Sequence, residues 1–534
     1  MLKRFGFVCC LLLLWVSVSV VGAQSEATQT HWWNDRVFYE IFVRSFSDSD
    51  GDGTGDIQGI IDRLDYLNDG DPTTTTDLGI TGLWLMPIFE SPSYHGYDVT
   101  NYSRVEPDYG SFSDFRRLVQ EAHNRGIAVI IDLVINHTSS RHPWFVASSQ
   151  QIPPYADYYV WSDTNPGFRG ADGQTVWYPR GGRFFYAAFW DQMPDLNLNS
   201  SAVTREVRNI ARNWMTVTGL DGFRLDGIKW LIENGDETAN TQSTMGWLLG
   251  YHQYIRSINP NALLVGEVWD SDFVSSEYVP RQVDLTFDFD LAGAILNAAR
   301  QRRPDPVLTI LRRLDNLYPP NQFASFITNH DQNRVMSQLQ GDAEAARVAA
   351  SLLLTTPGVP FLYYGEEIGM TGVKPDEQIR TPMRWDSTPI TAGFTTADEP
   401  WEPISTDDAS VNVADQSADP NSLLSYYRLL IHLRSEHPAL AHGSLTLIPI
   451  QGSRNVTAFL RQTDEETLLV VINLNNEAVS DYTLQYEGDL TFNGGEVIFG
   501  ASDGFQPVTN SLTDYAPFAT LPAQSTTIID LSAS

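Results

Sequence analysis

Eight short runs of apolar, β-branched and aromatic residues recur along this chain, and stretches with helical periodicity follow most of them. Strands that alternate with helices form parallel sheets, and eight such repeats are what a closed (β/α)8 barrel requires. The sixth run has Asp-rich flanks that are equally compatible with a loop. The runs lie at residues 37–42, 82–86, 128–134, 222–225, 263–266, 284–287, 324–328 and 360–363.

The pattern departs from a plain barrel in two places. Residues 138–202 contain many aromatics, Pro and Gly but few helical signals, and a structureless loop of that length is unusual. We therefore expect a small inserted domain after the third strand, above the barrel mouth. Residues 441–534 alternate strands with turns, which predicts a C-terminal antiparallel β-sandwich. The barrel would then comprise residues 24–137 and 203–440.

The first 23 residues have the pattern of a secretory signal peptide. Lys3 and Arg4 precede an apolar run, and small residues precede a cleavage position after Ala23. An uncleaved anchor is the alternative, but the run is short for a membrane span. Cys9 and Cys10, the only cysteines, lie in this segment, so the mature chain would have no disulfide. We expect a secreted protein without a membrane attachment after cleavage.

The formal net charge of −32 restricts the partners of this chain. Such a surface repels nucleic acid and anionic lipid, whereas a neutral substrate is indifferent to it. An acidic surface also keeps a protein soluble, which is the general explanation of this charge. Adaptation to high salt is the more specific explanation. We expect no nucleic-acid partner and a monomer.

Polar groups close four of the β-like runs. The side chains concerned are those of Asp132, Asn136 and His137, of Arg224 and Asp226, of Glu267, and of His330 and Asp331. In a parallel barrel the strand C-termini converge on one pocket, where the enzymes of this fold carry out their chemistry. Taken alone, each of these side chains would more often cap a helix or form a surface ion pair. Their joint occurrence indicates a catalytic rim.

The carboxylates suit glycosidic bond cleavage. Retaining glycosidases place a nucleophile and a general acid about 5–5.5 Å apart, and Asp226 and Glu267 end consecutive strands. Arg224 lies two residues before Asp226, so both side chains point to the same side and the guanidinium favours an ionised nucleophile. Apolar neighbours of Glu267 raise its pKa toward that of a general acid.

This ordered set of motifs resembles the α-amylase family of glycoside hydrolases, over nearly the whole mature chain. The resemblance implies Asp226 as nucleophile, Glu267 as general acid/base and Asp331 as the carboxylate that stabilises the distorted sugar. Asp132 would be the ion-pair partner of Arg224. The resemblance further implies sugar contacts from Arg224, His137 and His330, from Tyr97 by stacking, and from Lys229 on the leaving-group side.

Three segments bear on specificity, and they disagree. Tyr94 stands where exo-acting α-glucosidases carry an Asp, and residues 193–197 (Met-Pro-Asp-Leu-Asn) look intermediate between the oligo-1,6-glucosidase and neopullulanase types. Residues 380–385 resemble the glucosidases instead. The leading hypothesis is a secreted hydrolase of α-1,4 links in starch or maltodextrins. The alternatives are an α-glucosidase, oligo-1,6-glucosidase or trehalose-synthase-like transglycosylase, and a non-catalytic carbohydrate-binding protein.

Alternating Asp and Gly residues at positions 48–56 predict a loop for a hard cation. Closely spaced acids repel one another without a cation, which weighs against a merely solvated turn. By resemblance, Ca²⁺ would be bound by Asp48, Asp50, Asp52 and Asp56 and by the carbonyl of Thr54. Many amylases bind a second calcium through the residue equivalent to Asn136, but Trp230 replaces a usual His here, and the other ligands are not evident from the sequence.

Overall fold

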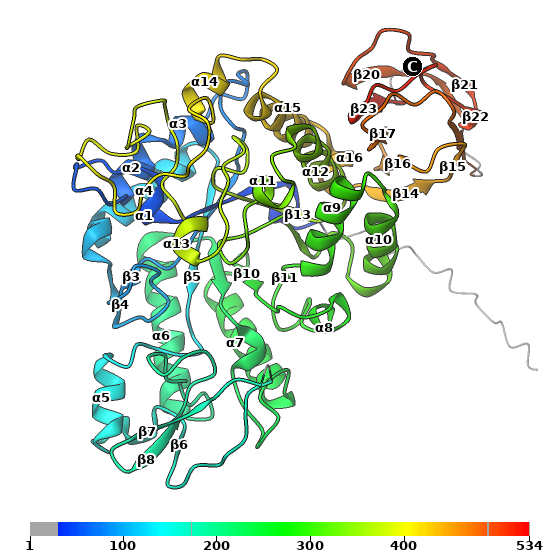
Figure 1. Ribbon diagram of the computed structural model, residues 1–534. Coiled ribbons are helices and arrows are strands. Elements are labelled where there is room, and N and C mark those ends of the chain that lie inside the picture. The colour runs from blue at the N-terminus through cyan, green and yellow to red at the C-terminus, as the bar shows by residue number, and fades with distance from the viewer. Residues whose placement is uncertain (1–29, 172, 487, 489–490, 533–534) are drawn as a thin grey trace, which may run out of the picture.

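The computed structural model describes residues 30–532 except 172, 487 and 489–490, so the expected signal peptide lies outside the described residues. Eight parallel strands pair in the order β11-β10-β9-β5-β2-β1-β13-β12, and a parallel bridge between Phe287 and Ala324 joins the two ends. The predicted barrel is confirmed (Figure 1). Its strands are β1 (Phe38–Ile41), β2 (Gly82–Leu85), β5 (Ala128–Leu133), β9 (Gly222–Leu225), β10 (Leu263–Gly266), β11 (Leu285–Thr286), β12 (Ala324–Ser325) and β13 (Val359–Tyr363).

The sixth and seventh strands are shorter than the sequence predicts. After β11 the Asp288 side chain accepts a hydrogen bond from the Leu291 amide, at 2.7 Å, and thereby caps the helix α9. The chain therefore leaves the ladder after two paired residues. The parallel bridge between Phe287 and Ala324 closes the barrel at this point.

Helices surround the barrel, and their apolar faces pack on it. The helix α4, for example, begins with a capping box in which Ser111 and Asp114 bond reciprocally, and α6 ends at Gly219 in a left-handed conformation (φ 83°). The longer helices are α4 (Phe112–Asn124), α6 (Ser201–Thr218), α7 (Gln242–Ile258), α9 (Phe289–Gln301), α10 (Asp305–Leu317), α12 (Ala343–Thr355) and α15 (Leu423–Glu436). The shorter ones are α1 (Val43–Phe46), α2 (Ile57–Asp62), α3 (Leu64–Leu67), α5 (Pro143–Ser149), α8 (Asp272–Ser276), α11 (Val335–Gln338), α13 (Asp376–Ile379), α14 (Val413–Ser417) and α16 (Pro438–His442).

The alternation of side chains along each barrel strand positions the polar groups of the mouth. Phe38 of β1 points into the barrel, where its ring stacks on that of Phe361 at 4.6 Å, and Tyr39 packs outward. Glu40 therefore points inward again, as do Asp132 of β5 and Arg224 of β9, which pair in register. The barrel interior is apolar toward the N-terminal ends of the strands and charged at their C-terminal ends.

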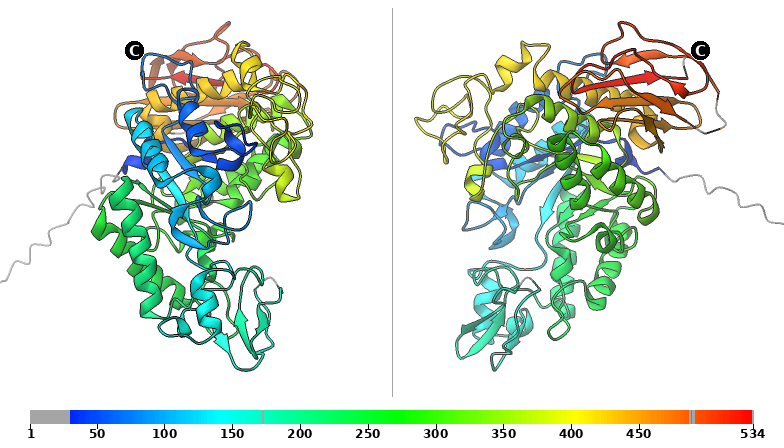
Figure 2. Two further views of the ribbon diagram at one scale, coloured as in Figure 1. Left: turned by 90° about the vertical axis from the view of Figure 1, so that its left-hand side faces the viewer. Right: turned by 45° about the vertical axis from the view of Figure 1, so that its right-hand side comes forward.

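The insertion holds a small antiparallel sheet and projects from the end of the barrel opposite the C-terminal domain (Figures 1 and 2). An antiparallel pair formed by β3 and β4 precedes it in the chain. These strands are β6 (Trp161–Ser162), β7 (Trp177–Arg180), β8 (Arg183–Tyr186), β3 (Phe89–Glu90) and β4 (Asn101–Val105).

The C-terminal domain is an antiparallel sandwich, as predicted. Alternate residues of β17 divide between two cores, because Leu469 and Val471 face the second layer of the sandwich while Val470 and Ile472 join the large core of the barrel. The main sheet contains β14 (Ser444–Ile448), β16 (Val456–Gln462), β17 (Thr467–Asn473), β23 (Ser525–Asp530) and β20 (Glu496–Phe499). The other strands are β15 (Ile450–Gln451), β18 (Thr483–Gln485), β22 (Thr513–Tyr515), β19 (Phe492–Gly494) and β21 (Val508–Asn510).

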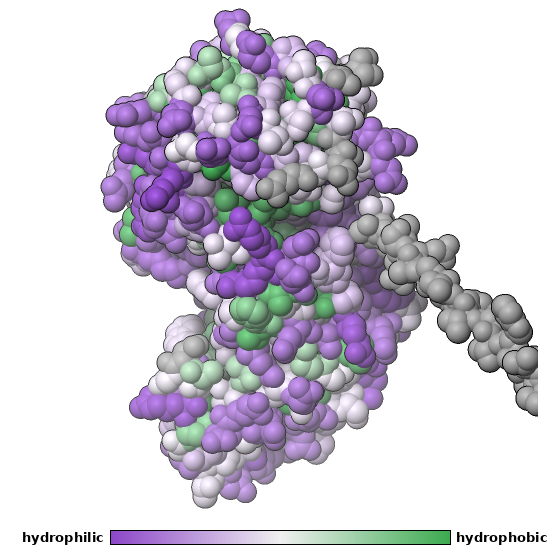
Figure 3. Space-filling model, turned by 90° about the vertical axis from the view of Figure 1, so that its right-hand side faces the viewer, coloured by the Kyte–Doolittle hydropathy of each residue, from purple (hydrophilic) through white to green (hydrophobic). Residues whose placement is uncertain are grey.

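Hydrophilic residues cover most of the face shown in Figure 3, with hydrophobic residues in patches between them. Among the described residues, no helix has both the length and the apolar character needed to cross a membrane.

Candidate active site

The polar side chains singled out in the sequence gather at the C-terminal mouth of the barrel. Strands β9 and β10 pair in register up to Leu225 and Gly266, so Asp226 and Glu267 occupy the next positions of two adjacent parallel strands. The ladder continues there, since the Glu267 amide donates to the Leu225 carbonyl at 3.0 Å. Neighbouring strands lie about 4.8 Å apart, and this spacing places the two carboxylates side by side.

Arg224 lies at the centre of the cluster with a fully buried side chain. Its guanidinium donates to Asp132 at 2.5 Å, to Asp226 at 2.9 Å and to Glu267 at 2.6 Å. The Trp84 ring lies 5.3 Å from it, and the Trp84 indole also donates to Asp132. One cation thus compensates three carboxylates, and Asp132 is the ion-pair partner that the resemblance implied.

Burial shifts the protonation of these carboxyls. It raises the pKa of Asp226 to about 6, although Arg224 acts in the opposite direction. The sequence predicted that Arg224 would favour the ionised form of Asp226, and it does act in that direction, but desolvation is the larger effect. Burial also raises the pKa of Glu267, opposed by Arg224 and reinforced by the charge of Asp226. Both carboxyls therefore hold a proton more readily than free carboxyls do.

A second group centres on His330, which is fully buried. Burial lowers its pKa, but the charges of Asp331 and Glu40 outweigh that effect and raise it to about 10. The imidazolium Nδ1 bonds to Glu40, and Nε2 lies 2.7 Å from the Tyr97 hydroxyl and 3.2 Å from Asp331. The cationic His330 in turn holds the pKa of Asp331 below its usual range, despite the opposing effect of burial.

The remaining predicted sugar contacts lie on the same rim. His137 is 1% exposed, burial lowers its pKa to about 3, and its Nε2 has no hydrogen-bond partner among the described residues. Lys229 is also buried; its ammonium donates to the Trp269 carbonyl at 2.6 Å and lies 3.5 Å from Asp270. The Tyr97 ring is 9% exposed and stacks on His330.

Sequence reasoning missed two charged residues of this site. Glu40 lies within the first apolar run, and a lone acid in a buried strand is the signal that could have identified it. Arg380 donates to Asp331 at 2.8 Å and to the His330 carbonyl at 2.9 Å, across a long loop. It was noted only as part of a specificity segment. No local pattern links it to Asp331.

Three acids of the predicted cation loop converge. One carboxylate oxygen from each of Asp48, Asp50 and Asp56 lies within 4.8 Å of the others, and this group does not include Asp52. Desolvation and the charges of Asp52, Asp48 and Asp56 raise the pKa of Asp50. Carboxylate oxygens are suitable ligands for Ca²⁺, so these residues fit a hard cation.

A buried polar group also lies where the insertion meets the barrel. The Asn136 amide donates to Asp195 at 3.1 Å, while its own Oδ1 has no partner among the residues that the structure describes. Burial and the charge of Glu233 raise the pKa of Asp195 well above its usual range, and burial raises that of Glu233 to about 7. Asp195, which bonds to Asn136 and is affected by the charge of Glu233, is thus a carboxyl group beside Asn136 that the sequence did not reveal.

Glu366 and Glu367 follow β13 in a turn and do not precede a helix, although two acids at such a position in the sequence would suit the first turn of one. Both are buried, and they accept hydrogen bonds from tyrosines: Glu366 from Tyr427 at 2.9 Å, and Glu367 from Tyr39 at 2.7 Å and Tyr66 at 2.6 Å. They therefore serve as buried hydrogen-bond acceptors for these tyrosines.

A (β/α)8 barrel whose mouth joins adjacent carboxylates through a buried arginine defines a carbohydrate-active enzyme of the glycosidase type. A family model described as "Alpha amylase, catalytic domain" matches residues 40–443. The chain belongs to the α-amylase family, and it is a glycoside hydrolase or transglycosylase of that family.

Relatives with different specificities match this chain. "Alpha-amylase 3" of Dictyoglomus thermophilum is 40% identical over 83% of this chain and 85% of its own length. "Trehalose synthase" of Thermus thermophilus is 34% identical over 83% of this chain, which spans 50% of that protein, and "Oligo-1,6-glucosidase" of Parageobacillus thermoglucosidasius is 30% identical over 84% and 91%. The solved structure of an "alpha-amylase from H.orenii" superposes with a TM-score of 0.80 and 40% identity, covering 93% of this chain and 99% of that one.

Proposed function

We propose that this protein is a secreted, retaining α-glucan hydrolase that cleaves α-1,4 links in starch and maltodextrins through a covalent glucosyl-enzyme intermediate. The observation that carries this proposal is the adjacency of Asp226 and Glu267 on paired strands. Inverting enzymes need about 6.5–9.5 Å between the carboxyls to accommodate a water molecule, and adjacent parallel strands do not provide that space.

The free oxygens of the two carboxyls assign their roles. Arg224 occupies Oδ1 of Asp226, and no described residue bonds to Oδ2, so Oδ2 attacks the anomeric carbon. Arg224 and the Gly227 amide both donate to Oε2 of Glu267, which leaves Oε1 to carry the proton. Glu267 gives that proton to the departing glycosidic oxygen. It then takes a proton from the water that releases the sugar from Asp226.

The other rim residues hold the sugar that is cleaved. The His137 Nε2 supplies a hydrogen-bond donor, His330 acts through Tyr97 and Asp331, with which its Nε2 is paired, and Asp331 accepts from sugar hydroxyls as positive charge develops on the ring. Arg224 keeps the nucleophile oriented, the accessible part of Tyr97 packs on the pyranose, and Lys229 contacts the leaving-group side. A buried site of fixed dipoles and charges stabilises such a transition state without reorganisation.

The transglycosylase and α-1,6-glucosidase alternatives are supported by one contact and by the relatives named trehalose synthase and oligo-1,6-glucosidase. Arg380 belongs to the glucosidase-like segment, and its ion pair with Asp331 brings that segment directly into the site. Tyr94, whose ring stacks on Trp401 at 5.5 Å, instead presents an aromatic wall where exo-glucosidases carry an acid. The relative with 40% identity is named an amylase, which favours α-1,4 hydrolysis.

Product analysis tests the specificity. Maltoheptaose, isomaltose and maltose would each be incubated with the enzyme and the products separated. We expect internal cuts of maltoheptaose, no turnover of isomaltose and no trehalose from maltose. Glucose as the sole product from maltoheptaose would contradict the amylase assignment, and trehalose would establish the transglycosylase. A fresh α-anomer in the first product, observed by NMR, tests retention, and a β-anomer would refute it.

We further propose that Ca²⁺ binds to the loop at residues 48–56, where it would stabilise the fold rather than take part in the chemistry. Asp48, Asp50 and Asp56 would supply carboxylate oxygens, with Asp52 and the Thr54 carbonyl completing the shell as the resemblance implies. The donors Asn136, Asp195 and Glu233 form a second candidate set. Export is tested separately, by sequencing the N-terminus of the mature protein, which we expect to begin at Gln24.

A further inference from the structure

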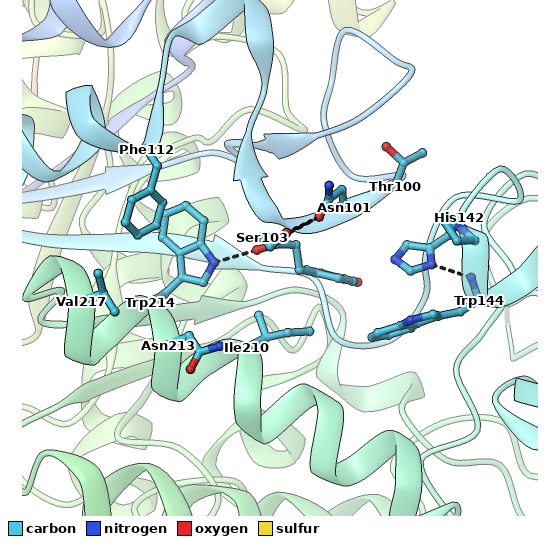
Figure 4. A pocket seen from close by; sticks show the side chains of 12 residues that line it. Thr100, Asn101, Ser103, Phe112, His142, Trp144, Ile210, Asn213, Trp214 and Val217 are labelled. Atoms are coloured by element: carbon cyan, nitrogen blue, oxygen red, sulfur yellow. Dashed lines mark hydrogen bonds between the residues drawn. The ribbon is translucent and has the colours of Figure 1, made fainter. Parts of the chain in front are cut away.

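A pocket of about 540 Å³ lies outside the barrel, where β4 and the first turn of α5 meet α6. Figure 4 shows Trp144 and His142 at one end, Phe112 and Trp214 at the other, and Ile210 and Asn213 of α6 along the bottom. None of the carboxylates of the barrel mouth lines it. This hollow is therefore separate from the candidate active site.

The lining of this pocket is aromatic and uncharged. None of its twelve residues is Asp, Glu, Lys or Arg, in a chain of which 19% of residues are charged. Burial lowers the pKa of His142 to about 3, so its imidazole is neutral at working pH. A charged ligand would find no counter-ion here, whereas a neutral one with an apolar face fits the rings.

Two polar groups of the lining have no hydrogen-bond partner among the residues that the structure describes. Nδ1 of His142 accepts a hydrogen bond from the Trp144 amide at 3.0 Å, so the proton is on Nε2. His142 is only 4% exposed, yet its Nε2 makes no hydrogen bond to any described residue, and the ring extends into the pocket (Figure 4). The exposed amide of Asn213 is also unbonded within the described part of the chain.

The pocket shares a wall with the active site. Tyr102 lines the pocket, and its hydroxyl donates to the carbonyls of Val134 at 2.8 Å and His137 at 3.1 Å. The same ring therefore supports the backbone of a residue on the catalytic rim. The Tyr102 side chain would therefore lie between a ligand in this pocket and the catalytic rim.

We propose that this pocket is an auxiliary binding site for a glucose segment of an α-glucan chain, an inference that rests on the proposed function. A pyranose has an apolar C–H face that packs on the half-buried Trp144 indole, and hydroxyls that pair with the His142 Nε2–H and the Asn213 amide. A neutral glucan also avoids the repulsion that a net charge of −32 imposes on anions.

Binding stoichiometry tests the proposal. Glu267→Gln suppresses turnover, so maltoheptaose can be titrated calorimetrically into the intact chain. We expect two sites in this variant, one after adding Trp144→Ala, and two after adding Phe273→Ala. Phe273 is a matched control because it is an exposed aromatic (54%) outside the pocket. On the active enzyme, Trp144→Ala should weaken adsorption to starch granules at least about tenfold while turnover of a short chromogenic maltoside is unchanged.

A second variant covers the case that Trp144→Ala does not fold. Asn213 is exposed, so Asn213→Arg should fold and place a long charged side chain in the pocket, with the same loss of one site. A single site in Glu267→Gln, or two sites that survive both substitutions, would overturn the auxiliary site and leave the proposed function intact. No binding of maltoheptaose at all would overturn both.

Discussion

Buried arginines occur at both ends of this barrel, and their surroundings differ. At the mouth, Arg224 contacts three carboxylates, whose charges raise its pKa well above the usual value despite burial. At the junction with the C-terminal domain, the partners of Arg434 and Arg461 among the described residues are all backbone carbonyls, including those of Leu354 and Thr355 at the end of α12. Burial lowers the pKa of Arg434 to about 10 and that of Arg461 well below its usual value.

Arg224 therefore serves the chemistry, whereas Arg434 and Arg461 serve the structure. The last carbonyls of a helix carry partial negative charge and lack partners, so Arg434 and Arg461 cap α12 and join the sandwich to the barrel. They need no carboxylate because the helix end supplies the charge. At the mouth, by contrast, carboxylates outnumber cationic side chains. This excess of negative charge favours a protonated carboxyl.

The largest effect we expect is on turnover. Asp226→Asn removes the attacking oxygen, so kcat should fall by about 10⁴-fold or more on a maltoside substrate. The fold should not suffer: burial raises the pKa of Asp226 from 3.8 to about 6, so the ionised carboxyl costs the folded state about 3 kcal/mol above pH 6. The melting temperature at pH 7 should be unchanged or higher. Unaltered kcat would refute the assignment of the nucleophile.

Arg224→Met should damage both activity and stability. It leaves Asp132, Asp226 and Glu267 buried without their cation, which costs about 3–5 kcal/mol in the free energy of unfolding. The loss should shrink as pH falls and the carboxyls take up protons. Denaturant titrations at pH 5 and pH 8 would measure it. A loss independent of pH would mean that packing, rather than charge, is responsible.

Arg461→Met is the matched change at the other end. It leaves the buried carbonyls of Thr355 and Gly443 without their donor, which costs about 1–3 kcal/mol. Because Arg461 is far in the fold from the carboxylates, kcat/KM should stay within about twofold of the parent value. A large fall in kcat/KM with normal stability would show that Arg461 contributes to catalysis and not to the structure alone.

The pH dependence follows from Asp226. Its carboxylate form is required for attack, so kcat/KM should decline below about pH 6, by about tenfold per pH unit, as the group takes up a proton. Stability moves in the opposite direction: a raised folded-state pKa means that this group stabilises the fold as pH falls from about 6 toward 4. Rate profiles and melting curves over pH 4–8 would test both signs together.

The sequence predicted the barrel because buried parallel strands are continuous apolar runs, and it placed the mouth residues because each ends such a run. The predictions were weaker where a contact joins distant segments without a local pattern. Arg380 reaches Asp331 from a loop beyond β13, and the buried Glu366 depends on Tyr427 of α15. The pocket behind Tyr102 exists only because β4, α5 and α6 meet. No single segment indicates it.

The loop at residues 48–56 differs from both ends of the barrel, because it has carboxylates but no arginine. No Lys or Arg among the described residues forms an ion pair with Asp48, Asp50 or Asp56, so their repulsion is offset by hydrogen bonds such as those from the Gly51 and Gly53 amides to Asp48, and a bound cation would offset it further. Chelation should therefore lower the melting temperature by a few degrees, and added Ca²⁺ should restore it. Asp50→Asn should abolish this response, whereas Asp71→Asn, at an acidic turn outside the group, should retain it. A melting temperature indifferent to chelator would mean that hydrogen bonds to the backbone, such as that from the Gly53 amide to Asp48 at 2.8 Å, suffice to hold the loop.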